Sequence, residues 1–90
     1  MTVKFFATFR ELTGERSCRI DSSPATAGEL LRLLSRRYGP AFEAAVFDDD
    51  RLAEMVIILV NGRNLVHTGG LDTPVSSGDV VSVFPMVAGG

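Results

Sequence analysis

Residues 26–39 constrain the fold more than any other segment, because they carry the start, the buried face and the stop of one amphipathic helix. Thr26 and Glu29 have the spacing of a capping box, in which the hydroxyl and the carboxylate each accept a hydrogen bond from a backbone N–H that the helix leaves unpaired. Gly39-Pro40 stops the helix. Its apolar positions recur at helical spacing and form one stripe: Leu30, Leu31, Leu34 and Tyr38. We therefore expect one main helix with a single face to bury.

The rest of the chain has mainly strand patterns, apart from a further helical turn or two at residues 41–47. Residues 55–60 are apolar at every position, which favours a strand covered on both faces. Asn61-Gly62 follows them and is a strong hairpin signal. The predicted strands cover residues 3–9, 17–20, 55–60, 65–66 and 80–84, with a turn-prone connection at 10–15, a solvated loop at 48–51 and Pro85 as the end of the last strand.

The predicted order is strand, strand, helix, strand, strand, strand, in a chain of 90 residues that is long enough for one domain. A helix with one apolar stripe packs most economically across one face of a small mixed sheet, which is an α+β fold. The strand alternation places Phe6 and Phe84 on the face away from this core. The predicted core residues are Val3, Phe5, Ile20, Leu30, Leu31, Leu34, Val81 and Val83.

Composition excludes several classes of function. The net charge is -2 with both signs scattered, so neither nucleic acid nor an anionic membrane is indicated as a partner. No apolar run approaches the ~20 residues of a membrane span, and the first residues lack a signal-peptide pattern, so we expect a cytoplasmic protein. The single cysteine, Cys18, excludes an internal disulfide. Neither Cys18 nor His67 has a second ligand at metal spacing, and we expect no bound metal or cofactor.

The chain ends in Gly89-Gly90, a pair that gains nothing from packing and weakens local order. A carboxylate on two glycines is a slim acyl group that can pass through a narrow channel into the active site of another enzyme. Because Pro85 ends the last strand, we expect a domain at residues 1–85 and an extended tail at 86–90 that reaches at most ~17–18 Å. Val87, Ala88 and Gly89 would then be threaded, and Gly90 would carry the reacting carboxylate.

Three segments read FFATFRELTG at residues 5–14, VNGR at 60–63 and GDVVSVFPMVAGG at 78–90. In this order they resemble the MoaD family, the small subunit of molybdopterin synthase, among the ubiquitin-like β-grasp sulfur carriers. Met86 departs from the proline that the family often repeats there. The resemblance implies a β-grasp fold in which the first and last strands are neighbours, so that Phe6 and Phe84 lie close together on the face opposite the helix.

The resemblance also implies a non-catalytic carrier. An adenylyltransferase of the MoeB or ThiF type would use ATP to turn the Gly90 carboxylate into an acyl-adenylate, and a sulfur donor would replace AMP to give a thiocarboxylate. The thiocarboxylate would deliver sulfur within a heterotetramer with a MoaE-type large subunit of molybdopterin synthase. The chain has no phosphate-binding loop and no nucleophile and base at recognisable spacing, in agreement with activation by another protein.

The MoaD family uses the positions of Phe6, Leu65 and Phe84 for docking. We therefore expect these three residues to bind the partner. Both phenylalanines would be substantially exposed in the free chain and buried in the complex. Arg32, Arg36 and Arg37 form the basic solvent face of the helix.

Other functions share this fold and tail. Related carriers serve thiazole synthesis, cysteine synthesis or tRNA thiolation, and a ubiquitin-like modifier would be joined to lysines of other proteins through Gly90. Sulfur transfer and conjugation share the adenylate and differ only in the final nucleophile, so the sequence leaves both open. A plain interaction domain with an inert tail is a third class.

Overall fold

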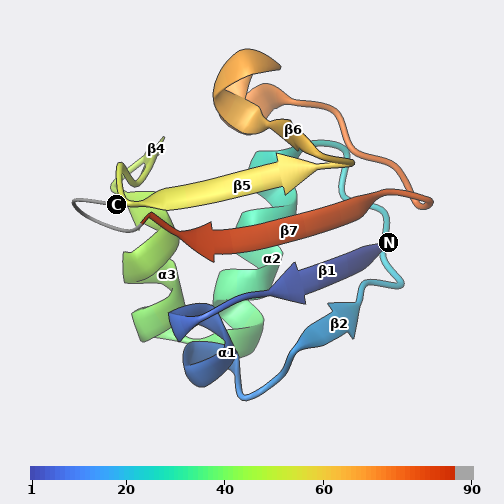
Figure 1. Cartoon of the computed structure of the whole chain (residues 1–90). Coiled ribbons are helices and arrows are strands. Elements are labelled where there is room, and N and C mark those ends of the chain that lie inside the picture. Colours follow the sequence, from blue (N-terminus) through green and yellow to red (C-terminus); the bar gives the residue numbers. More distant parts are fainter. Residues whose placement is uncertain (87–90) are drawn as a thin grey trace.

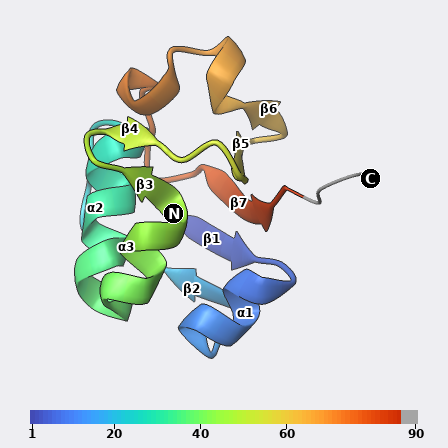
Figure 2. The same cartoon turned by 90° about the vertical axis from the view of Figure 1, so that its left-hand side faces the viewer.

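The computed structural model describes residues 1–86, which form two layers (Figures 1 and 2). One layer is a five-stranded sheet with the order β2-β1-β7-β5-β6. The two central strands, β1 and β7, run parallel, and the other neighbours are antiparallel. The strands of this sheet are β1 (Thr2–Phe5), β2 (Ser17–Arg19), β5 (Val56–Val60), β6 (Arg63–Asn64) and β7 (Val80–Pro85).

Helices α2 (Ala27–Tyr38) and α3 (Pro40–Val46) form the second layer and lie together on one side of the sheet (Figure 2). The long helix α2 crosses the sheet, and α3 follows it directly. Together with the sheet this is the predicted β-grasp arrangement of one main helix on one face. The remaining elements are α1 (Thr8–Thr13), the small hairpin of β3 (Phe47–Asp48) and β4 (Arg51–Leu52), and the 3₁₀ turns η1 (Leu65–His67) and η2 (Gly70–Asp72).

Helix α2 has the predicted ends. The Thr26 hydroxyl accepts a hydrogen bond from the Glu29 N–H at 3.2 Å, and the Glu29 carboxylate accepts one from the Thr26 N–H at 3.1 Å. Gly39 has a φ of 100°, a conformation that side chains other than glycine rarely adopt. Pro40 then begins α3, where its fixed φ and missing N–H suit the first helical position. The capping box and the glycine stop are therefore confirmed.

The core lies between α2, α3 and the sheet, and all eight predicted core residues are buried in it. The sequence patterns did not reveal its aromatic centre, which forms around Phe42 of α3. This fully buried ring lies 6.1 Å from that of Phe5, 5.8 Å from Phe9 and 5.6 Å from Tyr38, measured between centroids. Four aromatic rings from β1, α1, α2 and α3 thus join one end of the domain.

The predicted strand at residues 3–9 is wrong beyond Phe5. Ala7 has a φ of 53°, which interrupts the extended backbone, and α1 begins at Thr8. Arg10 secures the bend by donating a hydrogen bond from Nε to the Phe5 carbonyl at 3.0 Å. Phe9 still reaches the core, but from the helix and not by strand alternation.

Three further predictions differ from the structure. Residues 48–51 belong to the β3–β4 hairpin instead of a loop, and Leu65 lies in η1 instead of a strand. Strand β5 has one covered face only: Val56, Ile58 and Val60 are buried, whereas Ile57 and Leu59 are half-buried. The reason is that α2 and α3 both lie on the same side of the sheet.

The last strand ends at Pro85, as predicted, and β7 includes this proline, one residue beyond the predicted range 80–84. The Pro85 nitrogen faces the β1 side of β7. Because β1 has already ended at Phe5, the missing N–H costs no hydrogen bond between these two strands. The next amide, Met86 N–H, donates to the Met55 carbonyl at 2.8 Å. Met86 is therefore tied to the sheet, and the predicted tail residues Val87, Ala88, Gly89 and Gly90 lie outside the described residues.

The β5–β6 turn is fastened to the start of β7 by a polar cluster. Asn61 and Gly62 have φ values of 51° and 84°, as the predicted hairpin requires. The Asn61 amide donates to Asp79 at 2.8 Å and accepts from the Val80 N–H at 2.9 Å, while Asp79 also accepts from the Ser76 N–H at 2.8 Å. The hydrogen bond from Asn61, followed by that from the Ser76 backbone, holds the pKa of Asp79 below 3.8.

Leu34→Ala should lower the free energy of unfolding by ~2–5 kcal/mol, because Leu34 is fully buried on the core-facing side of α2. Urea denaturation measures this change, with Leu12→Ala as a control because Leu12 is 37% exposed. A midpoint for Leu34→Ala no lower than that of the control would contradict the assigned core face.

Asp79→Ala should destabilise the protein in a pH-dependent way. The pKa of Asp79 is lower in the folded state, so its carboxylate stabilises the fold above the unfolded value near 3.8, and this contribution disappears as the pH falls through the lower folded value. Thermal unfolding of both proteins should show a difference at about pH 7 that shrinks below about pH 4. A difference that is constant with pH would show that the charge of Asp79 contributes nothing.

Candidate functional site

Among residues 1–86, α2 and α3 lie on one face of the sheet and leave the opposite face open, and Figure 1 is seen from that open side. We call it the open face. The register of the strands defines it, since residues paired across neighbouring strands point to the same side. Its strand residues are Thr2, Lys4, Ser17, Arg19, Ile57, Leu59, Asn64, Val80, Ser82 and Phe84, and Phe6 joins them just after β1.

Phe6 and Phe84 form a stacked pair on this face. The Phe6 N–H donates to the Val83 carbonyl at 3.1 Å, which continues the pairing with β7 past the end of β1. The two rings lie 4.2 Å apart between centroids, with an angle of 8° between their planes. The prediction that they lie together is confirmed. The expected substantial exposure is wrong, because each ring covers one side of the other and both are half-buried.

Apolar residues extend from this pair along β5 and β7. Ile57 lies directly opposite Phe84, and Leu59 lies opposite Ser82. Val80 is 37% exposed, Met55 is 53% exposed and Met86 is 44% exposed. We call this surface the apolar strip; it consists of Phe6, Met55, Ile57, Leu59, Val80, Phe84 and Met86. Apolar side chains gathered on an open face are typical of a protein-binding site.

Ile57 and Leu59 were missed as surface residues, although the sequence contained a signal for them. Every second residue in the run at 55–60 lies on one face of a strand. The sequence pattern predicts cover on both sides, because nothing local distinguishes one face from the other. Only the position of the helices separates the buried set from the open one.

Leu65 is not part of this surface, so its assignment to partner binding is corrected. It is fully buried, because the chain bends at Asn64 into η1 and turns the leucine inward. The Asn64 side chain stabilises the bend by accepting a hydrogen bond from the Val66 N–H at 3.1 Å. The neighbouring Val66 is the exposed residue there, with 66% of its surface accessible.

The last described residue lies at one end of the apolar strip. Met86 pairs with Met55, and the strand that leads to it contains Phe84. A hollow of about 620 Å³ opens beside this point, with Leu12, Met55 and Met86 in its lining. Any protein that covers the apolar strip therefore also covers the point from which residues 87–90 continue.

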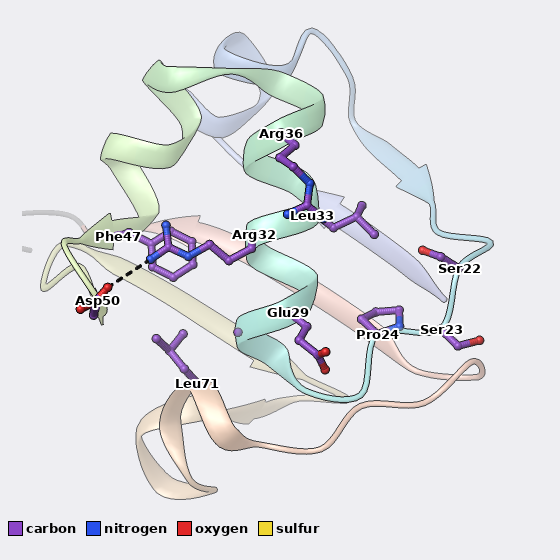
Figure 3. A pocket seen from close by; sticks show the side chains of 11 residues that line it. Ser22, Ser23, Pro24, Glu29, Arg32, Leu33, Arg36, Phe47, Asp50 and Leu71 are labelled. Atoms are coloured by element: carbon purple, nitrogen blue, oxygen red, sulfur yellow. Dashed lines mark ion pairs between the residues drawn. The ribbon is translucent and has the colours of Figure 1, made fainter.

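A second hollow, of about 570 Å³, lies on the helix side of the molecule (Figure 3). Arg32 crosses it with its guanidinium 3.7 Å from the centre of the Phe47 ring. The same group lies 3.9 Å from Asp50 and from Glu43, and donates to the Asp49 carbonyl at 3.0 Å. Arg32 thus holds the β3–β4 hairpin against α2, and its charge is balanced by acids of the same chain.

The described residues offer little else that could bind a ligand or react. Between Met1 and Met86, no cluster of three or more His, Cys, Asp or Glu side chains could hold a metal. No helix in this part of the chain is both long and apolar enough to cross a membrane. Cys18 is buried under α2, while His67 is exposed.

Phe6→Ala and Phe84→Ala should be coupled in their effects on stability. A stacked aromatic pair contributes about 0.5–1.5 kcal/mol beyond the burial of its parts, so the double variant should lose less stability than the two single variants together. A double-mutant cycle by urea denaturation measures this energy, and Phe84→Ala combined with Leu12→Ala is the control pair. If the double variant loses as much unfolding free energy as the two single variants together, the stack contributes nothing to stability.

Comparison with known proteins places the chain in a family. Its residues 3–90 match the model of the ThiS family. It is 42% identical over 92 residues to Small archaeal modifier protein 3 of Haloferax volcanii, covering 100% of this chain and 98% of the relative. It is 30% identical over 92 residues to Sulfur carrier protein CysO of Mycobacterium tuberculosis, with coverage of 100% and 98%.

The fold agrees with these relatives. The structure matches a chain in the crystal structure of the Amycolatopsis orientalis BexX/CysO complex with a TM-score of 0.84 and 29% identity, over 99% of this chain and 98% of that one. The sheet order, the single main helix and the match of the family model across the chain agree with one another. The chain therefore belongs to the ThiS family of ubiquitin-like sulfur carriers and protein modifiers.

Proposed function

We propose that this chain carries sulfur as a thiocarboxylate on Gly90 and delivers it for the synthesis of molybdopterin. The observation that carries the proposal is the position of Met86, which lies at one end of the apolar strip and leads directly into the Gly-Gly tail. A partner that binds the strip receives the tail at a defined place. The resemblance of residues 5–14, 60–63 and 78–90 to the small subunit of molybdopterin synthase supports the choice of pathway.

The proposed chemistry takes place on the carboxylate of Gly90 within partner enzymes. In an adenylyltransferase of the MoeB or ThiF type, the carboxylate would attack the α-phosphate of ATP and release pyrophosphate. A sulfur nucleophile would then attack the acyl carbon and displace AMP, leaving the thiocarboxylate. Because this chain supplies only the acyl group, it acts as a substrate and subunit and not as a catalyst. Activation consumes ATP, so we place it in the cytoplasm.

The apolar strip would hold the carrier on each partner in turn. The stacked rings of Phe6 and Phe84 are rigid and half-buried, so they lose little freedom on binding. Burying a fully exposed ring is worth roughly 1.5–3 kcal/mol, and a ring that is already half-buried contributes a correspondingly smaller part of this. The partners would be the adenylyltransferase and a MoaE-type large subunit, the latter in a heterotetramer. Leu65 takes no part, because it is buried in the carrier itself.

Conjugation to other proteins is a second candidate function. It is favoured by the relative that is 42% identical over the whole chain, which is named a small archaeal modifier protein. The same adenylate would then be attacked by a lysine amine, and an isopeptide bond would replace the thiocarboxylate. The CysO relative similarly favours delivery of sulfur to a pathway other than molybdopterin synthesis.

Removal of Gly90, or the addition of one alanine after it, should abolish adenylation and leave stability unchanged. The acyl group would then be displaced from the reacting position. Exchange of pyrophosphate into ATP by the purified adenylyltransferase of the same organism measures activation, and urea denaturation measures stability. An extended carrier that stays uncleaved by intact mass and is still activated would refute the proposal.

The two candidate functions can be separated by repeating the adenylation reaction with a sulfur donor and with other proteins as conjugation targets. A carrier gains the mass difference between sulfur and oxygen. A modifier becomes joined to lysines of other proteins, and trypsin then leaves residues 64–90 on those lysines, because Arg63 is the last lysine or arginine before Gly90. Formation of molybdopterin from its precursor, with the MoaE-type subunit present, tests the proposed pathway.

Phe84→Asp should weaken binding to the adenylyltransferase by roughly 2 kcal/mol or more, since interface energy concentrates in a few aromatic anchors. Its effect on unfolding should be much smaller than that of Leu34→Ala. Isothermal titration calorimetry measures the affinity, and Val66→Asp is the matched control because Val66 is exposed outside the apolar strip. Loss of stability like that of Leu34→Ala, with affinity preserved, would assign Phe84 to the core instead.

A further inference from the structure

The open face is divided into an apolar half and a basic half. The apolar strip follows β5 and β7. On the neighbouring strands the outward residues include Lys4 of β1 and Arg19 of β2, both of them exposed. Arg10 of α1 adds a third cation at the end of β1, where its guanidinium carbon lies 5.5 Å from the centre of the Phe6 ring.

This concentration of positive charge does not follow from composition. The chain has 9 Lys and Arg against 11 Asp and Glu, with a net charge of -2. None of the strand positions that define the open face is Asp or Glu. Within residues 1–86, both ion pairs involve Arg32 on the helix side, so none neutralises Lys4, Arg10 or Arg19.

The sheet fixes the distance between the basic half and the apolar half of the open face. Lys4 is in register with Ser82, and Ser82 is in register with Leu59, so Lys4 lies two strand spacings from the apolar centre of β5. Strands are ~4.8 Å apart, which places the two backbone positions about 10 Å from each other. Arg10 is held in place by its hydrogen bond to the Phe5 carbonyl at 3.0 Å. The sheet therefore fixes the backbone positions of Lys4 and Arg19, and this hydrogen bond fixes the guanidinium of Arg10.

We propose that the basic half of the open face selects and orients the partner enzyme by binding carboxylates that lie beside its apolar contact surface. This rests on the proposed function, because the partner in question is the adenylyltransferase that receives the tail. An apolar strip alone can be bound in more than one direction along the strands. Three cations on one side allow a single direction, which brings the Met86 end to the active site. A partner with Lys or Arg at those positions is repelled.

Charge reversal tests this proposal with the purified adenylyltransferase of the same organism as the probe. The variant is Lys4→Glu with Arg19→Glu, which leaves the Arg10 hydrogen bond to Phe5 intact. The control is Arg36→Glu with Arg51→Glu, which changes the net charge equally at exposed positions outside the open face. Circular dichroism checks folding, and Lys4→Gln with Arg19→Gln provides a milder variant if the first one unfolds.

Stopped-flow association at several salt concentrations gives the readout. The open-face variant should associate about tenfold more slowly than the wild type at low salt and lose most of its salt dependence, since steering by charge acts mainly on association. The control should stay within about twofold of the wild type. The Gln variant should show a smaller effect in the same direction.

The outcomes separate the two proposals. If the wild type is adenylated but the open-face variant associates like the control, the charge proposal is overturned and the carrier function stands. If the control slows as much as the variant, only net charge matters and the charge proposal is again overturned. If the wild type is not adenylated at all, the proposed function fails, and the charge proposal fails with it.

Discussion

The rest of the structure depends on the parallel pairing of β1 with β7, the first and last strands of the chain. It brings Val3 beside Val81 and Phe5 beside Val83 at the centre of the sheet, where α2 covers all four. Because side chains alternate along a strand, the same register sends Lys4 and Ser82 to the other side. One pairing thus produces both the core and the open face.

The two faces of the sheet serve different purposes. On the helix side, the apolar stripe, the aromatic cluster and the capped helix ends all make contacts within the chain. The charge of Arg32 is likewise balanced by neighbouring acids of the same chain. On the open side, the Phe6–Phe84 stack and the half-buried Ile57 and Leu59 leave apolar surface at the point where the chain continues toward Gly90. A carrier needs this separation, since its fold must survive repeated docking and release.

Predictions that depend on local chemistry agreed with the structure. The capping box, the glycine stop and the Asn61-Gly62 turn each involve residues a few positions apart, so the sequence contains the whole interaction. Predictions that extended a local pattern over distance were less accurate. The alternation at residues 3–9 continues past Phe5, yet the backbone bends at Ala7, where Arg10 donates a hydrogen bond from the following helix to the Phe5 carbonyl.

By itself, the sequence determined the main helix, eight of the buried core residues and the family to which the chain belongs. The tertiary structure alone decided which apolar residues remain at the surface. Leu65 and Ile57 are equally hydrophobic in sequence, but a bend at Asn64 buries the first, and the absence of a helix over the open face leaves the second half-exposed. Exposure depends on what covers a residue, and that cover comes from segments far away in the chain.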